Sequence, residues 1–122
     1  KTLATASQDL SVKIWNRKTR KVLKTIKNAH GKLAGEVTYT PNGGILVSAG
    51  HDAIVRTWEP NSGERLQQFG GHIGVIFRLG IHPSKNQVVS SSADNTAKIW
   101  DAGTGTVLLT RKGHGRNVYS AT

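Results

Sequence analysis

The sequence predicts an all-β protein built from repeated antiparallel units of about 42 residues. Three tryptophans, Trp15, Trp58 and Trp100, are separated by 43 and 42 residues, and an aspartate stands six residues before each of them. The residues just before each tryptophan alternate between apolar and polar side chains, which is typical of short half-buried strands. No segment shows sustained helical periodicity with caps, so the pattern favours sheets throughout.

Turn-forming residues divide each unit into strands. Runs such as Pro41-Asn42-Gly43-Gly44 and Asn61-Ser62-Gly63 supply the conformations that tight hairpins need. The first unit is expected to lack its innermost strand and to hold strands at 2–7, 11–15 and 21–27. The two complete units are expected to hold strands at 35–40, 45–49, 54–59 and 64–69, and at 75–81, 87–92, 96–100 and 106–111. A final strand is expected at 117–121. The predicted divisions of the chain are therefore 1–29, 30–71, 72–113 and 114–122.

Further residue types keep the same register as the tryptophans. Histidines recur every 42 residues, a hydroxyl side chain stands four residues before each aspartate, and a leucine stands eight residues after each tryptophan. The pair Gly71-His72, the pair Gly113-His114 and the run from Asp94 to Asp101 resemble the WD-repeat β-propeller family. The resemblance covers essentially the whole chain, although Ala29 replaces the glycine of one Gly-His pair.

The resemblance implies a partial β-propeller of about three four-stranded antiparallel blades. Propellers close their ring with typically about 4–8 blades. The chain is therefore expected to be a segment of a larger propeller, often seven-bladed in this family. The missing blades would come from the same longer chain or from other copies.

The resemblance also implies that the repeated polar residues form buried hydrogen-bond chains inside the blades. Satisfied networks of this kind rigidify a fold. The expected structural network is His30, Ser48, Asp52 and Trp58 in one unit, His72, Ser90, Asp94 and Trp100 in the next, the partial set Thr5, Asp9 and Trp15, and His114 at the start of a fourth unit.

Two chemical alternatives are weighed against this structural interpretation. A catalytic triad is needed once, whereas this set recurs with every unit. Zinc requires ligands that converge on one point, and equivalent residues of successive blades diverge around a ring. We therefore expect no enzyme activity, no metal site and no cofactor. Base stacking by the tryptophans is disfavoured because they end alternating strands, which places them in the interior.

Partner binding is expected at the narrower face of the propeller, by resemblance to the family. The positions that carry over are Gln8, His51 and Ala93 before the turn aspartates, and Leu33, Gly35, Val75, Phe77, Asn117 and Tyr119 after the histidines. Phe77 and Tyr119 belong to the residue types that dominate interface energies. An equal alternative is that Val75 and Phe77 simply pack at a blade edge.

A basic stretch is the second candidate surface. The formal net charge is +10, and residues 1–34 carry nine basic side chains against one acidic one. The basic patch comprises Arg17, Lys18, Arg20, Lys21, Lys24, Lys27 and Lys32. Clustered cations attract RNA, acidic protein tails or anionic lipid. They also protect a strand edge from unwanted pairing, so a solvated edge is the alternative interpretation.

The sequence favours a non-catalytic WD-repeat scaffold for protein–protein assembly in a multi-subunit complex. The alternative function is a ribonucleoprotein component that contacts RNA or acidic partners through Arg17–Lys32. The chain has no cysteine, no apolar run long enough to cross a bilayer and no signal-peptide pattern. We therefore expect an intracellular protein, cytoplasmic or nuclear, without membrane insertion.

Overall fold

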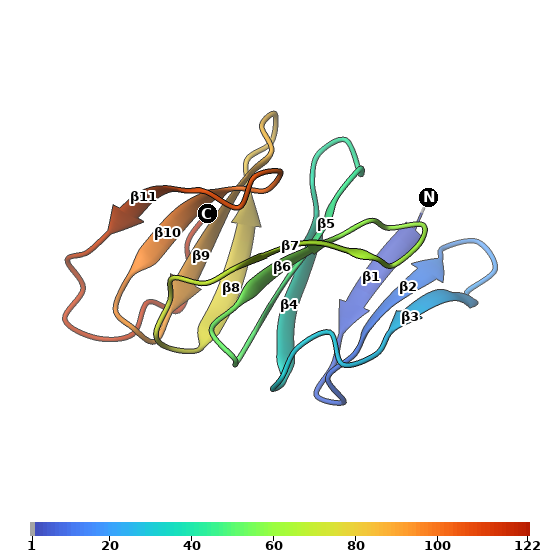
Figure 1. Cartoon of the computed structure of the whole chain (residues 1–122), viewed down its shortest axis with the longest axis horizontal. Coiled ribbons are helices and arrows are strands. Elements are labelled where there is room, and N and C mark those ends of the chain that lie inside the picture. Colours follow the sequence, from blue (N-terminus) through green and yellow to red (C-terminus); the bar gives the residue numbers. More distant parts are fainter. Residues whose placement is uncertain (1) are drawn as a thin grey trace.

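Three twisted antiparallel sheets stand side by side in the computed structural model, which describes residues 2–122 (Figure 1). The first sheet contains β1 (Thr2–Ala6), β2 (Val12–Asn16) and β3 (Val22–Ile26). The second contains β4 (Ala34–Tyr39), β5 (Leu46–Gly50), β6 (Val55–Trp58) and β7 (Arg65–Phe69). The third contains β8 (Ile76–Ile81), β9 (Gln87–Ser92), β10 (Ala97–Asp101) and β11 (Val107–Arg111). The all-β prediction is confirmed.

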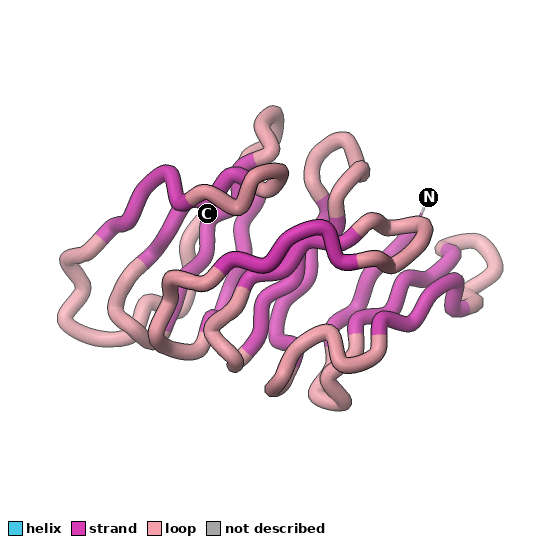
Figure 2. The backbone as a smooth tube through the Cα atoms, in the orientation of Figure 1, coloured by secondary structure: helices cyan, strands magenta, loops and turns pink. Residues whose placement is uncertain are grey.

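The strand order within each sheet follows the chain, because tight turns join neighbouring strands. The orders are β1-β2-β3, β4-β5-β6-β7 and β8-β9-β10-β11. The ends of these eleven strands lie within one residue of the predicted ends. Strands and loops account for all described residues (Figure 2), and no helix among them is long and apolar enough to cross a membrane.

The expected strand at 117–121 is absent. Residues 117–122 form no ladder, although the Val118 N–H donates to the Ser92 carbonyl oxygen at 3.0 Å. The inner strands β4 and β8 each pair with the strand that follows them in sequence. Residues 117–121 pair with no other strand among the described residues. Val118 is nevertheless buried, like Ala34 and Ile76 at the equivalent positions.

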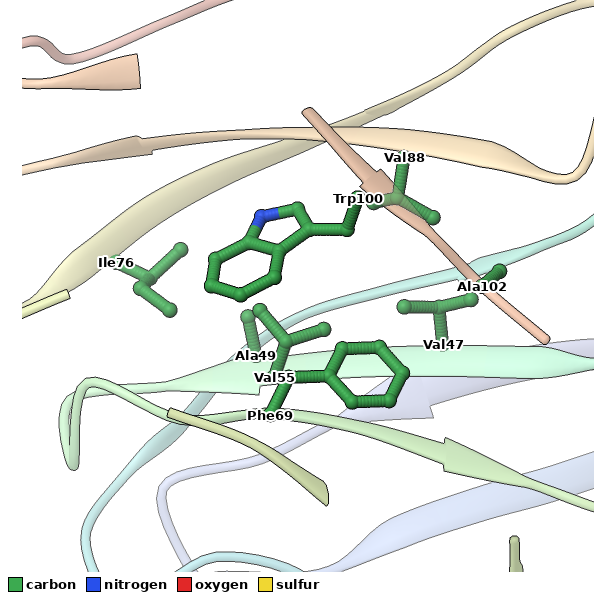
Figure 3. Close-up of a cluster of buried hydrophobic side chains, with 8 residues drawn as sticks. All are labelled: Val47, Ala49, Val55, Phe69, Ile76, Val88, Trp100 and Ala102. Atoms are coloured by element: carbon green, nitrogen blue, oxygen red, sulfur yellow. The ribbon is translucent and has the colours of Figure 1, made fainter. Parts of the chain in front are cut away.

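Apolar side chains fill the spaces between the sheets. One cluster joins the first and second sheets and includes Val12, Ile14, Leu46 and Trp58. The other joins the second and third sheets and includes Val47, Val55, Phe69, Val88 and Trp100 (Figure 3). The Phe69 and Trp100 rings stack with centroids 6.0 Å apart. The apolar side chains on a sheet face are therefore buried where a neighbouring sheet covers that face.

The contact between the outer edges of the second and third sheets depends on a glycine. Gly105 lies in the turn before β11 with φ +77°, a region that favours glycine. A Cβ atom at Gly105 would overlap the Phe69 ring from the neighbouring sheet. The turn residue and the ring are thus matched in shape, and we expect larger residues at position 105 to push the sheets apart.

Candidate functional site

The third sheet holds a continuous chain of polar side chains. The His72 Nδ1–H donates to Asp94 Oδ2 at 2.7 Å, and His72 Nε2 lies 2.8 Å from Ser90 Oγ. The Trp100 indole N–H donates to the same Ser90 oxygen at 2.7 Å. Since a carboxylate can only accept, this pattern leaves Nε2 to accept the Ser90 hydroxyl proton. The Thr96 hydroxyl donates to Asp94 Oδ1 at 2.6 Å.

The second sheet repeats this chain with one added cation. His30 Nδ1 lies 3.0 Å from Asp52 Oδ1, His30 Nε2 lies 2.8 Å from Ser48 Oγ, and the Trp58 indole N–H donates to Ser48 at 2.8 Å. Arg56 donates to Asp52 Oδ2 at 2.6 Å, and the same Nη1 lies 2.7 Å from His30 Nδ1. A guanidinium carries only donors, so this close contact disfavours a proton on His30 Nδ1.

The remaining members of the predicted network are not brought into such a chain. The Trp15 indole N–H donates to Thr5 Oγ1 at 2.9 Å, but Asp9 bonds instead to Ser11, whose hydroxyl donates to it at 2.6 Å. His114 is exposed and makes no hydrogen bond among the described residues. The place of His114 in the network of a fourth unit stays a prediction.

Burial and hydrogen bonding set the protonation states of the two chains. Burial acts to raise the pKa of Asp94, but donors from Thr96, His72 and the Ile73 backbone outweigh it and lower that pKa to about 2. Burial lowers the pKa of His72 and of His30, against the attraction of their carboxylates. Arg56 lowers the pKa of His30 further. Both imidazoles are therefore neutral at pH 7.

The network residues cannot be approached as a reaction centre in this structure. Ser48 and Ser90 are fully buried, and the side chains of His30 and His72 have no exposed surface. Among residues 2–122, no three histidine, cysteine or acidic side chains converge as metal ligands. The arrangement joins neighbouring strands and loops through hydrogen bonds, and it leaves no room for a substrate.

The predicted partner-binding residues lie in loops and strand ends at one end of the sheets, on the side of the β5–β6 and β9–β10 turns. The His51 N–H donates to the Leu33 carbonyl at 2.9 Å, and the Ala93 N–H donates to the Val75 carbonyl at 2.9 Å. Phe77 and Tyr119 stack with ring centroids 4.9 Å apart. Gln8 and Asn117 are exposed. The structure therefore places Leu33 beside His51, Val75 beside Ala93 and Phe77 beside Tyr119.

The basic residues occupy the β2–β3 turn, the strand β3 and the loop that follows it. Arg17, Lys18, Arg20 and Lys21 occupy the β2–β3 turn, whereas Lys27 and Lys32 follow β3 at its other end. A five-residue strand is about 17 Å long, so the two groups are well separated. Lys24 lies between them on β3, and Lys27 falls just beyond the strand on which it was expected. The basic stretch therefore combines a cationic turn with residues along and beyond an edge strand, and its role as a binding patch stays a prediction.

Sequence patterns missed three residues that shape the site. Arg56 and Thr96 each bond to the aspartate of their own sheet, but they occupy non-equivalent positions in the repeat. Ile73 is 93% exposed beside the buried His72. The signal for Arg56 was available, because an arginine four residues after Asp52 faces the same side of a hairpin. Its direct approach to His30 required coordinates.

The three sheets, with tight sequential strands and a repeated histidine, hydroxyl, carboxylate and indole set, define blades of a β-propeller. A family model described as "WD domain, G-beta repeat" matches residues 20–59 and 63–101. These matches cover more than half of the sequence. The chain belongs to the WD-repeat family.

Curated relatives include eukaryotic translation initiation factor 3 subunit I from two distant organisms. The Schizosaccharomyces pombe protein is 35% identical over 83 residues, which is 68% of this chain and 25% of the relative. The Xenopus tropicalis protein is 32% identical over 79 residues, which is 65% of this chain and 24% of the relative. The chain thus spans about a quarter of the length of these relatives.

Solved structures show the same fold at lower sequence identity. The WD40 repeats of RRP9 superpose with a TM-score of 0.90 and 23% identity, covering 95% of this chain and 36% of that one. The structure of U3-55K gives a TM-score of 0.90 and 23% identity, covering 95% of this chain and 37% of that one. At this identity the likeness concerns the fold alone.

Proposed function

We propose that this chain contributes to a non-catalytic WD-repeat scaffold that assembles proteins into a multi-subunit complex. The relatives named as subunits of a translation initiation factor support this proposal, as does the burial of the repeated polar residues. An intracellular location, cytoplasmic or nuclear, is part of the same proposal. Propeller folds present surfaces, so the function must be assigned to a particular face.

The observation that carries the proposal is the aromatic pair on the inner side of the third sheet. Tyr119 is 66% exposed and its ring stacks on Phe77. The two rings border a hollow of about 520 Å³ that is also lined by Arg78 and Ser120. An exposed tyrosine stacked on a half-buried phenylalanine beside an arginine offers aromatic and arginine side chains, the types that dominate the energetics of protein interfaces.

The test is retention of partner proteins by the native assembly. We expect Phe77→Ala combined with Tyr119→Ala to release partners in a pull-down, and crosslinking mass spectrometry to report neighbours of the inner strands in the unaltered protein. The matched control is Leu66→Ala with Leu108→Ala, which removes two exposed apolar side chains from outer strands. The proposal fails if both variants retain the same partners as the unaltered chain.

The second candidate function is contact with RNA or acidic partners through the basic residues. The exposure of Arg17, Lys18, Arg20 and Lys21 in one turn favours this candidate. Binding to RNA through several phosphates should weaken steeply between about 50 and 200 mM salt. An Arg17–Lys32 stretch acting only as a solvated edge would show no binding at either salt concentration.

A further inference from the structure

Equivalent turns of the three sheets carry opposite charge. The turn between the third strand of a unit and its outermost strand comprises residues 16–21, 59–64 and 101–106. The first has a formal charge of +4, the second −2 and the third −1. Because the backbone is the same kind of hairpin in each sheet, this difference is not needed for folding.

The cationic turn is held in one conformation by its first residue. Asn16 Oδ1 accepts the N–H groups of Lys18 and Thr19, both at 2.9 Å. The Arg20 N–H donates to the Asn16 carbonyl at 2.9 Å. Among residues 2–122, none of the four cations of this turn lies within ion-pair distance of a carboxylate. The turn therefore displays four exposed charges without internal partners.

The turn continues into an open strand edge. β3 is the last strand of the first sheet and pairs with β2 alone (Figure 1). Leu23 is 54% exposed, and Val22 is exposed beside it. β7 and β11 are also edge strands, but the turns before them are acidic. β3 is the one of the three that has cations both before it, at Lys21, and after it, at Lys27.

We propose that the β3 edge and the cationic turn form a docking site for an extended acidic segment of a partner protein. The segment would add to β3 as a further strand through backbone hydrogen bonds. Its carboxylates would face Arg17, Lys18 and Lys21, and its aliphatic side chains would contact Leu23. This site is separate from the Phe77 and Tyr119 face, so it can fail while the scaffold proposal stands. The proposal rests on the second candidate function above and specifies its acidic partner.

Charge and side-chain chemistry select this partner over two others. Residues 16–27 contain no aromatic side chain on which a nucleic acid base could stack. Trp15, which lines a hollow with Arg17 and Arg20, is held at its strand by its indole N–H bond to Thr5. Val22 and Leu23 fit aliphatic groups. A second β3 edge from another copy would bring lysines against lysines, and such repulsion is how edge strands avoid pairing with themselves. A strand with acidic side chains would instead be attracted to the lysines of the β3 edge.

The first experiment measures fluorescence anisotropy of a labelled peptide with the unaltered 122-residue chain. The peptide alternates glutamate and valine over about ten residues, and two further versions carry N-methyl groups on either alternate set of residues. We expect the unmodified peptide to bind, and one methylated version to bind on the order of tenfold more weakly, because N-methylation removes strand hydrogen bonds. Equal binding by all three peptides, or no binding, overturns the proposal.

The second experiment transplants the acidic turn of the second sheet. The variant Lys18→Asn, Arg20→Gly, Lys21→Glu installs the residues found at Asn61, Gly63 and Glu64. We expect peptide binding to weaken on the order of tenfold. The control Lys85→Glu with Lys112→Glu makes the same change in net charge away from β3, and it should bind as the unaltered chain does.

An equal loss of binding in the control variant would show nonspecific charge attraction and overturn the proposal. A labelled uridine oligonucleotide of about 20 residues tests the nucleic acid alternative, and binding of that probe without binding of the peptide also overturns the proposal. If the turn variant does not fold by circular dichroism, the methylated peptides on the unaltered chain decide the outcome.

Discussion

The second and third sheets supply the aspartate of their networks with different donors: an arginine in the second sheet and a threonine hydroxyl in the third. In the third sheet, Thr96 and the neutral His72 satisfy Asp94. In the second sheet, an isoleucine replaces that threonine and Arg56 donates to Asp52 instead. The same fold therefore tolerates a network with an unpaired negative charge on Asp94 and one in which Arg56 neutralises the carboxylate of Asp52. The two should differ in what happens when the shared carboxylate is removed.

The largest effect is expected for Asp52→Ala. This change leaves the Arg56 guanidinium facing His30 without a carboxylate, and breaking a buried pair in this way is strongly destabilising. We expect a loss of about 3 kcal/mol in the free energy of unfolding, measured by urea denaturation. The double variant Asp52→Ala, Arg56→Gln should recover part of that loss. A double variant as unstable as the single one would show that the stranded cation is not the cause.

Asp94→Ala should cost less because no cation is stranded. It removes acceptors for His72, Thr96 and the Ile73 N–H. We expect a loss of about 1–3 kcal/mol. Differential scanning calorimetry of the Asp94 and Asp52 variants side by side measures the contrast. An unchanged melting temperature for Asp94→Ala would remove the network from the account of stability.

Acid should destabilise the protein in two stages. The pKa values of His30 and His72 are depressed by burial, so the stability that this neutrality gives is complete above about pH 6.5 and falls below it. The pKa of Asp94 is lowered from 3.8 to about 2. That shift contributes about 2 kcal/mol, which is present above pH 4 and lost as the pH falls toward 2.

Urea midpoints measured from pH 8 to pH 2 test both stages. Asp94→Asn should remove the Asp94 part of the lower stage, while it keeps the parts that belong to the histidines and to Asp52, whose pKa is also lowered. If Asp94→Asn and the unaltered chain lose stability in parallel below pH 4, the acid sensitivity arises from other carboxylates.

The smallest effect concerns a buried hydroxyl and should be stabilising. Thr57 is fully buried and its Oγ1 has no hydrogen-bond partner, whereas the equivalent residues Ile14 and Ile99 are aliphatic. Thr57→Val keeps the shape and removes the unsatisfied oxygen, so we expect a gain of about 1 kcal/mol by urea denaturation. Thr40→Val is the matched control, because the Thr40 hydroxyl is bonded to Asn42 at 2.9 Å and its removal should destabilise.

Local pattern was sufficient to locate the strands but not to locate every partner. Period-two alternation before Trp58 and turn residues such as Gly63 placed strand ends within one residue, since both are properties of neighbouring residues in the chain. The predicted strand at 117–121 is absent from the structure. A ladder needs a second strand, and a local sequence pattern does not show whether that second strand is present. Residues of the basic stretch that are close in sequence lie at opposite ends of β3, which only the structure shows.

The repeat itself determined the sheet count, the identity of the buried polar residues and the family. The spacing of repeated residues can be read along the chain without knowing how the chain folds. Tertiary structure alone decided that Arg56 enters the second network and that Phe69 requires Gly105 in the next sheet. Contacts between sheets depend on side-chain shape and direction across a distance of about 10 Å. A periodic sequence does not encode those contacts position by position, so they differ between units that look alike.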